Sequence, residues 1–172
     1  MKPFKQFLLP ILFLTSLSAA ATAQDFSFGA GLAYGTEISQ PGFKVDAVLG
    51  ISDRIRASSD LVIYLTEELD DNIDADWLEI NGNGHYLFYE DEGLTVYAIS
   101  GVNFTRLRFD YPEIDTGFGI LPGTTESRTE WGLNIGSGLE YQAGFFSLVS
   151  EVKYVLSEAD QLVISAGLRV PF

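Results

Sequence analysis

The sequence predicts an all-β fold, an eight-stranded antiparallel up-and-down barrel, and three observations carry this prediction. Apolar and polar residues alternate with a period of two in eight segments of roughly 9–13 residues, the length that a tilted strand needs to cross a bilayer. The links between these segments alternate between long and short. No segment after the N-terminal stretch shows the helical period, so no helix competes with the strands.

The first four segments each have one apolar and one polar parity, as expected for a strand with two different faces. In chain order they are 26–34, 43–51, 55–65 and 78–88. Their apolar faces begin with Phe26 and Phe28, Phe43 and Val45, Ile55 and Ala57, and Leu78 and Ile80. Their polar faces carry Ser27 and Gly29, Lys44 and Asp46, Arg56 and Asp60, and Glu79 and His85.

The last four segments repeat the pattern at 94–104, 131–141, 146–154 and 162–172. Their apolar faces carry Leu94 and Val96, Trp131 and Leu133, Phe146 and Leu148, and Leu162 and Ile164. Their polar faces carry Thr95 and Asn103, Glu130 and Glu140, Glu151 and Lys153, and Ser165 and Arg169. The phase becomes ambiguous only at Arg106, Leu107 and Arg108.

The connections predict how the strands are ordered. The long links are 35–42, 66–76, 110–128 and 156–160, and the short turns are 52–54, 90–93 and 142–144. Long links at one end and short turns at the other are typical of an up-and-down barrel of the outer-membrane type. An even strand number then places both termini at the short-turn side, which would face the periplasm.

The N-terminal 23 residues predict a cleaved signal peptide, followed by one barrel domain at 24–172. Lys2 and Lys5 precede an apolar core at 7–14, and Ala21-Thr22-Ala23 fits the small-residue cleavage rule. The core is too short for a membrane-spanning helix; a buried N-terminal helix is the alternative.

Composition excludes several classes of protein. Of 172 residues, 24 are acidic and 10 are basic, giving a formal charge of -14, which becomes -16 once Lys2 and Lys5 are removed. Such a chain repels polyanions, so we expect no nucleic-acid partner. Because 47% of residues are hydrophobic, an acidic disordered chain is also excluded. The absence of Cys rules out disulfides and thiol-based metal sites.

Alternation alone does not say which face is outside, because a soluble lipocalin-like barrel would turn its apolar face inward. Two features favour an outward apolar face and hence a transmembrane barrel. Aromatic residues such as Phe28, Tyr34, Trp131 and Tyr154 gather near segment ends, as in the girdles at membrane interfaces. The polar parity mixes Gly with charges of both signs, which suits a narrow lumen better than a solvent face.

With these features the chain resembles the small OmpA/OmpX-type outer-membrane β-barrel family. The runs Gly29-Ala30-Gly31 and Gly136-Ser137-Gly138 and the last segment ending at Phe172 fit that family. The resemblance implies integral location in a Gram-negative outer membrane, contact with its lipids and lipopolysaccharide, and porin-like architecture. It also implies that the barrel-assembly machinery reads the last strand through Leu168, Val170 and Phe172. We expect a monomer without a cofactor.

The inward parity predicts an ion-pair network that fills the lumen. An eight-stranded barrel leaves just enough interior space for side chains, and charges buried there must pair. The residues of this predicted network are Lys44, Asp46, Arg56, Asp60, Glu79, His85, Glu130, Glu140, Glu151, Lys153 and Arg169. A closed plug and a narrow cation-preferring pore, favoured by the surplus of acids, are the two interpretations.

The sequence predicts a non-catalytic protein, with a lipid-modifying enzyme as a further alternative. Some enzymes of this architecture use a Ser, His and Glu set near the outer rim. His85 is the single histidine, lies near the short-turn end and is followed by Tyr86-Leu87-Phe88, not by the His-x-Ser-Asn run of lipid A deacylases.

The long links are the expected place for recognition, and they predict a structural or surface-interaction role. Link 66–76 is acidic and resembles the start of an EF-hand loop, but Ala75 and Asn81 replace the required Gly and Glu. We therefore predict weak divalent-cation contact and no dedicated metal site. The acidic residues are Glu67, Glu68, Asp70, Asp71, Asp74 and Asp76. Link 110–128, with apolar Ile114, Phe118 and Ile120, is interpreted as a cap over the barrel mouth or a partner surface.

Overall fold

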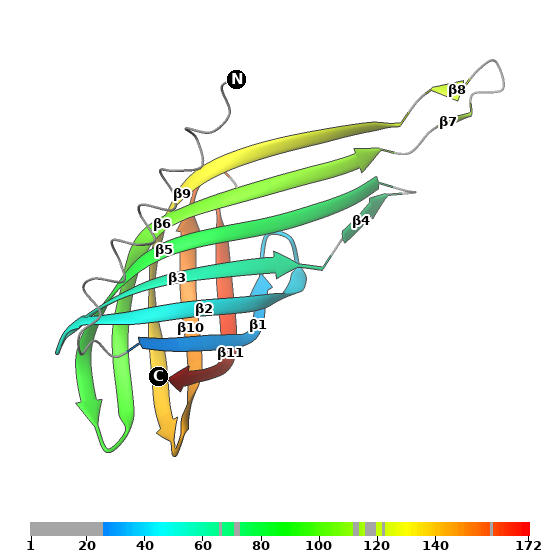
Figure 1. Ribbon diagram of the computed structural model, residues 1–172. Helices are drawn as coiled ribbons and strands as arrows, with labels where there is room; N and C mark the ends of the chain where they lie inside the picture. Colours follow the sequence, from blue (N-terminus) through cyan, green and yellow to red (C-terminus); the bar gives the residue numbers. More distant parts are fainter. Residues whose placement is uncertain are drawn as a thin grey trace, which may run out of the picture.

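The structure, a computed structural model, is a closed ring of eight long antiparallel strands (Figure 1). It describes residues 26–65, 67–70, 73–111, 114–115, 120–121, 123–158 and 160–172. The predicted signal peptide, 1–23, lies outside these residues. The ring strands are β1 (Phe26–Gly35), β2 (Gln40–Ser52), β3 (Ile55–Tyr64), β5 (Ile73–Asp91), β6 (Leu94–Tyr111), β9 (Thr124–Ala143), β10 (Phe146–Leu156) and β11 (Gln161–Pro171).

Each ring strand pairs with its two neighbours, and the pairing of β1 with β11 closes the ring. The last residue continues this seam, since the Phe172 amide donates to the Phe26 carbonyl. The predicted fold class, an eight-stranded up-and-down barrel, is confirmed. Among the described residues, no helix has the length and apolar character needed to span a bilayer.

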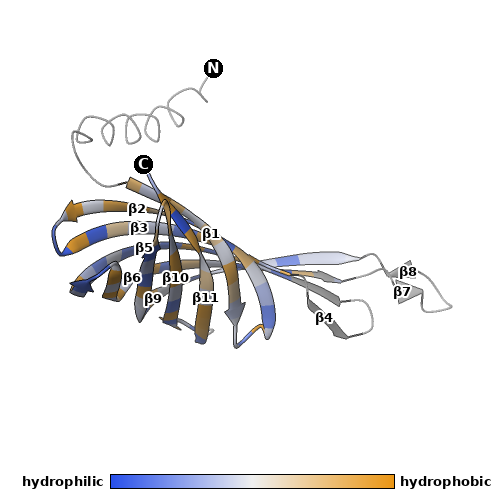
Figure 2. Cartoon of the chain, turned by 90° about the horizontal axis from the view of Figure 1, so that it is seen from below, coloured by the Kyte–Doolittle hydropathy of each residue, from blue (hydrophilic) through white to orange (hydrophobic). Residues whose placement is uncertain are grey.

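Side chains segregate between the two faces of the barrel wall as the alternation predicts. Figure 2 shows apolar and polar positions alternating along the strands. On the outer face, Phe43 and Trp131 are 62% and 71% exposed, whereas Glu79 and Arg169 on the inner face are 0% and 1% exposed. A wall that is apolar outside and charged inside is the reverse of a soluble domain, which excludes the lipocalin-like arrangement.

The predicted links were too long, because the strands extend beyond the alternating segments. The first link shrinks from 35–42 to 36–39, and the third shrinks from 110–128 to 112–123 because β6 ends at Tyr111 and β9 begins at Thr124 (Figure 1). Two short strands, β7 (Ile114–Asp115) and β8 (Ile120–Leu121), pair with each other in a separate small sheet. The extensions escape a hydropathy pattern because both faces of a sheet meet water above the bilayer.

The acidic link 66–76 is also part of a sheet. β4 (Glu67–Asp70) pairs antiparallel with the first residues of β5, so the backbone forms a hairpin in place of the predicted loop. We call residues 73–76, 108–111, 124–127 and β4 the protruding sheet. Its ring strands continue past Leu78 and Leu133, where β3 and β10 cease to pair with them.

The ambiguous phase at 106–108 is settled by pairing. β6 and β9 stay in register without a bulge from Leu94 to Tyr111, so Leu107 points inward while Arg106 and Arg108 are exposed. The short turns have the geometry of tight hairpins; Glu92 and Gly93 both adopt positive φ, of 46° and 83°. Positive φ at both central residues suits the right-handed twist of the flanking strands.

Candidate functional site

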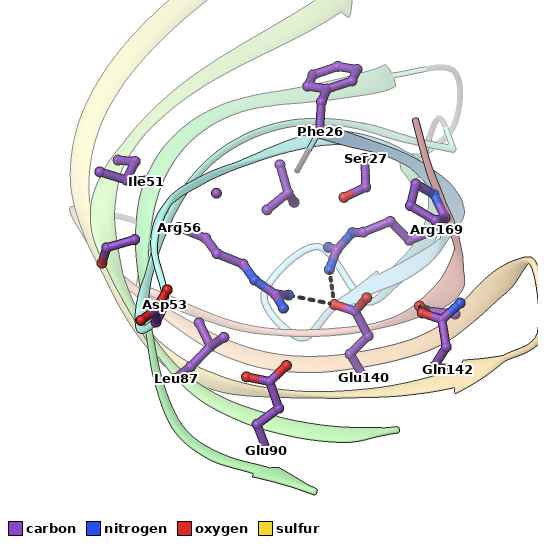
Figure 3. Close-up of a pocket in the computed structure, with 15 residues that line it drawn as sticks. Phe26, Ser27, Ile51, Asp53, Arg56, Leu87, Glu90, Glu140, Gln142 and Arg169 are labelled. Carbon is purple, nitrogen blue, oxygen red and sulfur yellow. Dashed lines mark hydrogen bonds and ion pairs between the residues drawn. The ribbon is translucent and has the colours of Figure 1, made fainter. Parts of the chain in front are cut away.

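The lumen is the candidate functional site, and its polar side chains connect across the barrel. At the short-turn end, Arg169 of β11 pairs with Asp46 of β2 and donates to Glu140 of β9 at 2.8 Å. Glu140 also pairs with Arg56 of β3 at 3.1 Å (Figure 3). Arg169 lies 3.5 Å from a carboxylate oxygen of Glu151 on β10. One guanidinium therefore connects strands that lie across the barrel from each other.

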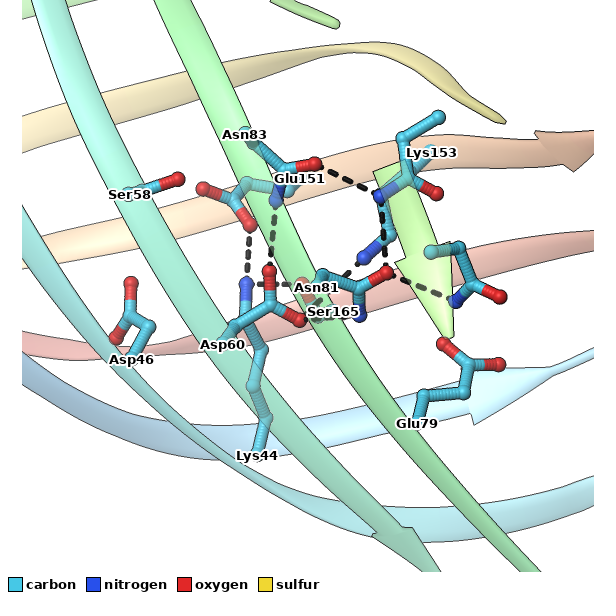
Figure 4. A network of polar contacts seen from close by, with 12 residues as sticks. Lys44, Asp46, Ser58, Asp60, Glu79, Asn81, Asn83, Glu151, Lys153 and Ser165 are labelled. Carbon is cyan, nitrogen blue, oxygen red and sulfur yellow. Dashed lines mark hydrogen bonds and ion pairs between the residues drawn. The ribbon is translucent and has the colours of Figure 1, made fainter. Parts of the chain in front are cut away.

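The middle of the lumen holds two Lys–carboxylate pairs (Figure 4). Lys44 pairs with Glu151, which also accepts a 2.7 Å hydrogen bond from the Tyr97 hydroxyl. Lys153 lies 3.4 Å from Asp60. An unpaired buried ion costs on the order of several kcal/mol. Charges can therefore be kept in so narrow a space only if they make such contacts.

An amide network extends from Asp60 toward the end of the barrel that carries the long links and the protruding sheet, which we call the long-strand end. Asn81 and Asn83 donate to the two Asp60 oxygens at 2.8 and 2.9 Å. The Asn134 amide donates to Asn81 and Asn83 at 2.9 and 2.7 Å, and Asn103 donates to Asn81 at 2.8 Å. Two asparagines of β5 thus bind the Asp60 carboxylate, and two more from β6 and β9 hold those asparagines in place without adding charge.

Two predicted network acids lie apart from the ion pairs of Lys44, Arg56, Lys153 and Arg169. Glu79 is fully buried and accepts hydrogen bonds from Gln161 and, at 3.3 Å, from the Tyr64 hydroxyl. Glu130 is 7% exposed and pairs at 2.7 Å with Arg128, whose other partner is Glu158. Eight of the other nine predicted network residues form the ion pairs and hydrogen bonds given above. The ninth, His85, contacts Ser58 and Tyr97.

An apolar layer crosses the lumen at the long-strand end, and sequence reasoning missed it. Ile38 comes from the β1–β2 turn, and the other members are inward residues of the ring strands. The buried residues of the layer are Ala33, Ile38, Val62, Tyr64, Trp77, Leu107, Val155 and Val163, with Phe109 packed against them. The available signal was the presence of apolar residues, such as Val62 and Val163, on the polar parity of six strands.

His85 contacts a hydroxyl but has no carboxylate on its other nitrogen. Its Nε2 lies 2.9 Å from the Ser58 hydroxyl, and its ring stacks on Tyr97 with centroids 4.6 Å apart. Nδ1 is buried without a hydrogen-bond partner among the described residues. A nucleophilic serine needs a histidine that is itself oriented by a third group, so this pair is incomplete as a catalytic set.

A vestibule opens at the short-turn end of the lumen. Its cavity measures about 660 Å³ and has Arg56, Glu140 and Arg169 in its lining, with Asp53 and Glu90 near the turns (Figure 3). The lumen is therefore open to solvent from the short-turn side down to the Arg56–Glu140–Arg169 contacts. At the other end lies the apolar layer.

The remaining predicted residues lie on the surface wherever the structure describes their side chains. Leu168, Val170 and Phe172 project from the outer face of β11, where Phe172 is 82% exposed. Asp76 is exposed, and the side chains of Glu67, Glu68, Asp70, Asp71 and Asp74 lie outside the described part of the chain. In that part, no group of three or more His, Cys, Asp or Glu side chains could hold a metal ion.

Comparison with known proteins identifies the fold. No protein-family model and no curated protein matches the chain. Among solved structures, it is similar to Ail, the attachment invasion locus protein of Yersinia pestis, solved with the heparin analogue sucrose octasulfate (17% identity, TM-score 0.63, 88% of this chain and 100% of Ail).

Two further structures show the same architecture. Neisserial surface protein A matches with 20% identity and a TM-score of 0.60 over 87% of this chain and 96% of its own. A major outer membrane protein of Thermus thermophilus matches with 13% identity and a TM-score of 0.66 over 87% of this chain and 100% of its own. The chain therefore has the fold of the small eight-stranded outer-membrane β-barrels, the OmpA/OmpX-type architecture that its sequence resembles.

Proposed function

We propose that the protein is an integral protein of a bacterial outer membrane, with a closed lumen and a structural or surface-interaction role. The observation that carries this is the segregation of side chains across the wall: large apolar residues are exposed outside while the charges pair inside. Only a lipid environment makes such an outer face favourable. The protruding sheet then faces the exterior and the short turns face the periplasm.

Two successive barriers in the lumen favour a plug over a pore. The ion-pair network ties strands together across the interior, and the apolar layer with Trp77 and Ile38 stands above it. A hydrated cation would have to break buried pairs and then cross an apolar constriction. The vestibule provides water access from one side only.

Single-channel recording in planar bilayers tests the closed lumen. We expect no openings for the wild-type protein at moderate voltage. Discrete cation-selective openings would overturn the plug and establish the narrow pore. A Trp77→Ala/Ile38→Ala variant serves as the comparison, because it removes bulk from the apolar layer without touching an ion pair.

The role we propose is non-catalytic. The Ser58–His85 pair lies within the lumen, and the described residues leave His85 Nδ1 without the carboxylate that a serine nucleophile requires. Incubation of the purified barrel with lipopolysaccharide, followed by mass spectrometry of the lipid, tests this directly. Loss of an acyl chain by the wild-type protein but not by Ser58→Ala would establish the enzyme alternative.

The protruding sheet supports the surface-interaction role. Residues 124–131 of β9 have no strand partner on the β10 side among the described residues, so the β9 edge of the protruding sheet is open. Open edges present unpaired N–H and C=O groups to other chains. The acidic residues of link 66–76, of which Asp76 is exposed, are proposed to make weak contact with divalent cations. Leu168, Val170 and Phe172 are proposed as the assembly signal.

A further inference from the structure

The basic residues of this acidic chain are unevenly placed. Two precede the described residues, four pair inside the lumen and one, Arg54, lies at a short turn. The remaining three are on or next to the protruding sheet: Arg106, Arg108 and Arg128. Arg128 pairs with Glu130 and Glu158. The outer surface therefore concentrates its cations at the long-strand end, in a molecule of formal charge -14.

Arg106 stands out among these three because no described carboxylate lies within ion-pair distance of it. Its guanidinium is exposed, and its one contact with a described side chain is a 3.3 Å hydrogen bond from Nε to the Ser127 hydroxyl. In register, it lies between Leu78 of β5 and Thr129 of β9. Within the described part of the chain, no carboxylate forms an ion pair with this guanidinium.

Directly below Arg106 on the same outer face is an aromatic pair. Phe104 and Trp131 lie opposite each other on β6 and β9, with ring centroids 4.9 Å apart at 74°. Trp131 is 71% exposed toward the outside. Aromatic rings of outer-membrane barrels lie at the depth of the lipid headgroups, so the guanidinium two residues further along β6 lies at the level of the headgroup phosphates.

We propose that Arg106, with Phe104 and Trp131, forms a binding site for a phosphorylated glycolipid of the outer leaflet. The guanidinium hydrogen-bonds a phosphate group, and the aromatic pair packs on the upper acyl chains of the same lipid. The charge is complementary, and the site combines a cation and an apolar surface as an amphiphile requires. This inference rests on the proposed outer-membrane location with the protruding sheet outward.

The test is retention of lipid A by the folded barrel in mild detergent, measured by native mass spectrometry. Wild-type protein is loaded with bisphosphorylated lipid A, with enzymatically dephosphorylated lipid A or with phosphatidylglycerol. Arg106→Gln is compared with Arg54→Gln, which removes an exposed cation at the opposite rim and so controls for net charge.

We expect wild type and Arg54→Gln to retain the phosphorylated lipid equally, and Arg106→Gln to lose about tenfold in occupancy, the effect of one charge-assisted hydrogen bond. The dephosphorylated lipid should be retained weakly by all three. Equal retention by Arg106→Gln and wild type, equal losses in both variants, or equal retention of phosphatidylglycerol would overturn the site. Heat-modifiable migration of each sample on gels reports barrel folding separately, so failure of the site is distinguishable from failure of the proposed function.

Discussion

Glycines on the inner face create the space that the lumen side chains occupy. A Cβ on Gly138 would lie 2.3 to 2.5 Å from ring atoms of Tyr97, and one on Gly29 would lie 1.9 Å from an Asp46 oxygen. Both glycines belong to the Gly-x-Gly runs that the sequence shows. Their role is therefore to admit Tyr97, the partner of Glu151, and Asp46, the partner of Arg169.

Gly138→Ala should destabilise the barrel by about 1–3 kcal/mol, because the added methyl displaces the rigid Tyr97 ring. Urea unfolding in lipid vesicles, followed by tryptophan fluorescence, measures the change. Gly84→Ala is the matched control: its Cβ would have no heavy atom nearer than 3.8 Å, so its effect should stay within about 0.5 kcal/mol. Equal effects of the two substitutions would contradict this account of Gly138.

The buried Lys153–Asp60 pair should behave differently from an exposed pair. Removing one partner by Lys153→Met or Asp60→Asn should cost about 3–5 kcal/mol, since the other charge stays buried without its ion-pair partner. The double variant should cost less than the sum of the two. Glu158→Gln breaks the exposed Arg128–Glu158 pair and should cost less than about 1 kcal/mol. Additive losses in the double variant would show that the pair is not coupled.

At the scale of elements, the protruding sheet and the barrel wall have separable roles. The ring ends at Leu78 of β5 and Leu133 of β9, where pairing with β3 and β10 stops. Beyond these residues the protruding sheet is held only by pairing among its own strands. The tip of β6 and β9 can therefore be removed without opening the ring. Arg108 and Ser127 face each other in register and provide the place to join the shortened strands.

A variant in which an Asn-Gly turn replaces residues 109–126 should fold and lose surface interactions. Folding is read from heat-modifiable migration on gels, and interaction from autoaggregation and adhesion of cells that display each protein. We expect the trimmed barrel to migrate as a folded species and to aggregate or adhere less than the full chain. Equal behaviour of the displaying cells would contradict the surface-interaction role and leave the structural one. Arg106 stays in place, so the lipid site is tested independently.

The β1–β2 turn is a second element with a defined role, since it positions Ile38 in the apolar layer. Thr36 exchanges hydrogen bonds with Leu162 on β11, each 3.0 Å, through its amide and its hydroxyl. This anchors the turn so that Ile38 points into the apolar layer, where it is 4% exposed. The turn therefore contributes to the apolar layer at the long-strand end of the lumen.

For the whole molecule, the two tryptophans report opposite sides of the wall. Trp131 is 71% exposed on the outer face and Trp77 is 8% exposed within the lumen. In bilayers whose acyl chains carry bromine near the headgroup, fluorescence of Trp77→Phe protein, which retains Trp131, should be strongly quenched. Trp131→Phe protein should be quenched far less. The reverse order would mean that the barrel is inside out with respect to lipid.

The acidic residues of the molecule divide between the lumen and the two rims. Four bases inside the lumen are matched by Asp46, Asp60, Glu140 and Glu151. The surplus of acids is found largely at the two rims, for example at Glu90, Asp91 and Glu92 on a short turn. Against that background Arg106, an exposed guanidinium without an ion-pair partner among the described residues, is a local reversal of sign.

The sequence by itself determined the number of ring strands, the facing of each strand and the charged residues that enter the lumen, but not the apolar residues there. Lipid on one side and a narrow polar interior on the other impose a period of two on every strand, and that pattern is local. Where both faces are wet, as in the protruding sheet, the pattern fades; the sequence therefore predicted loops at 66–76 and 110–128 where strands continue.

Only the tertiary structure decided which lumen residues meet. Lys44 and Glu151 are 107 positions apart, and Arg169 and Asp46 are 123 apart. Their contacts depend on the register with which β1 closes on β11 and on the curvature of the ring, neither of which a single strand encodes. The apolar layer follows for the same reason: Val62, Trp77 and Val163 lie on separate strands, and only closure of the barrel brings them together.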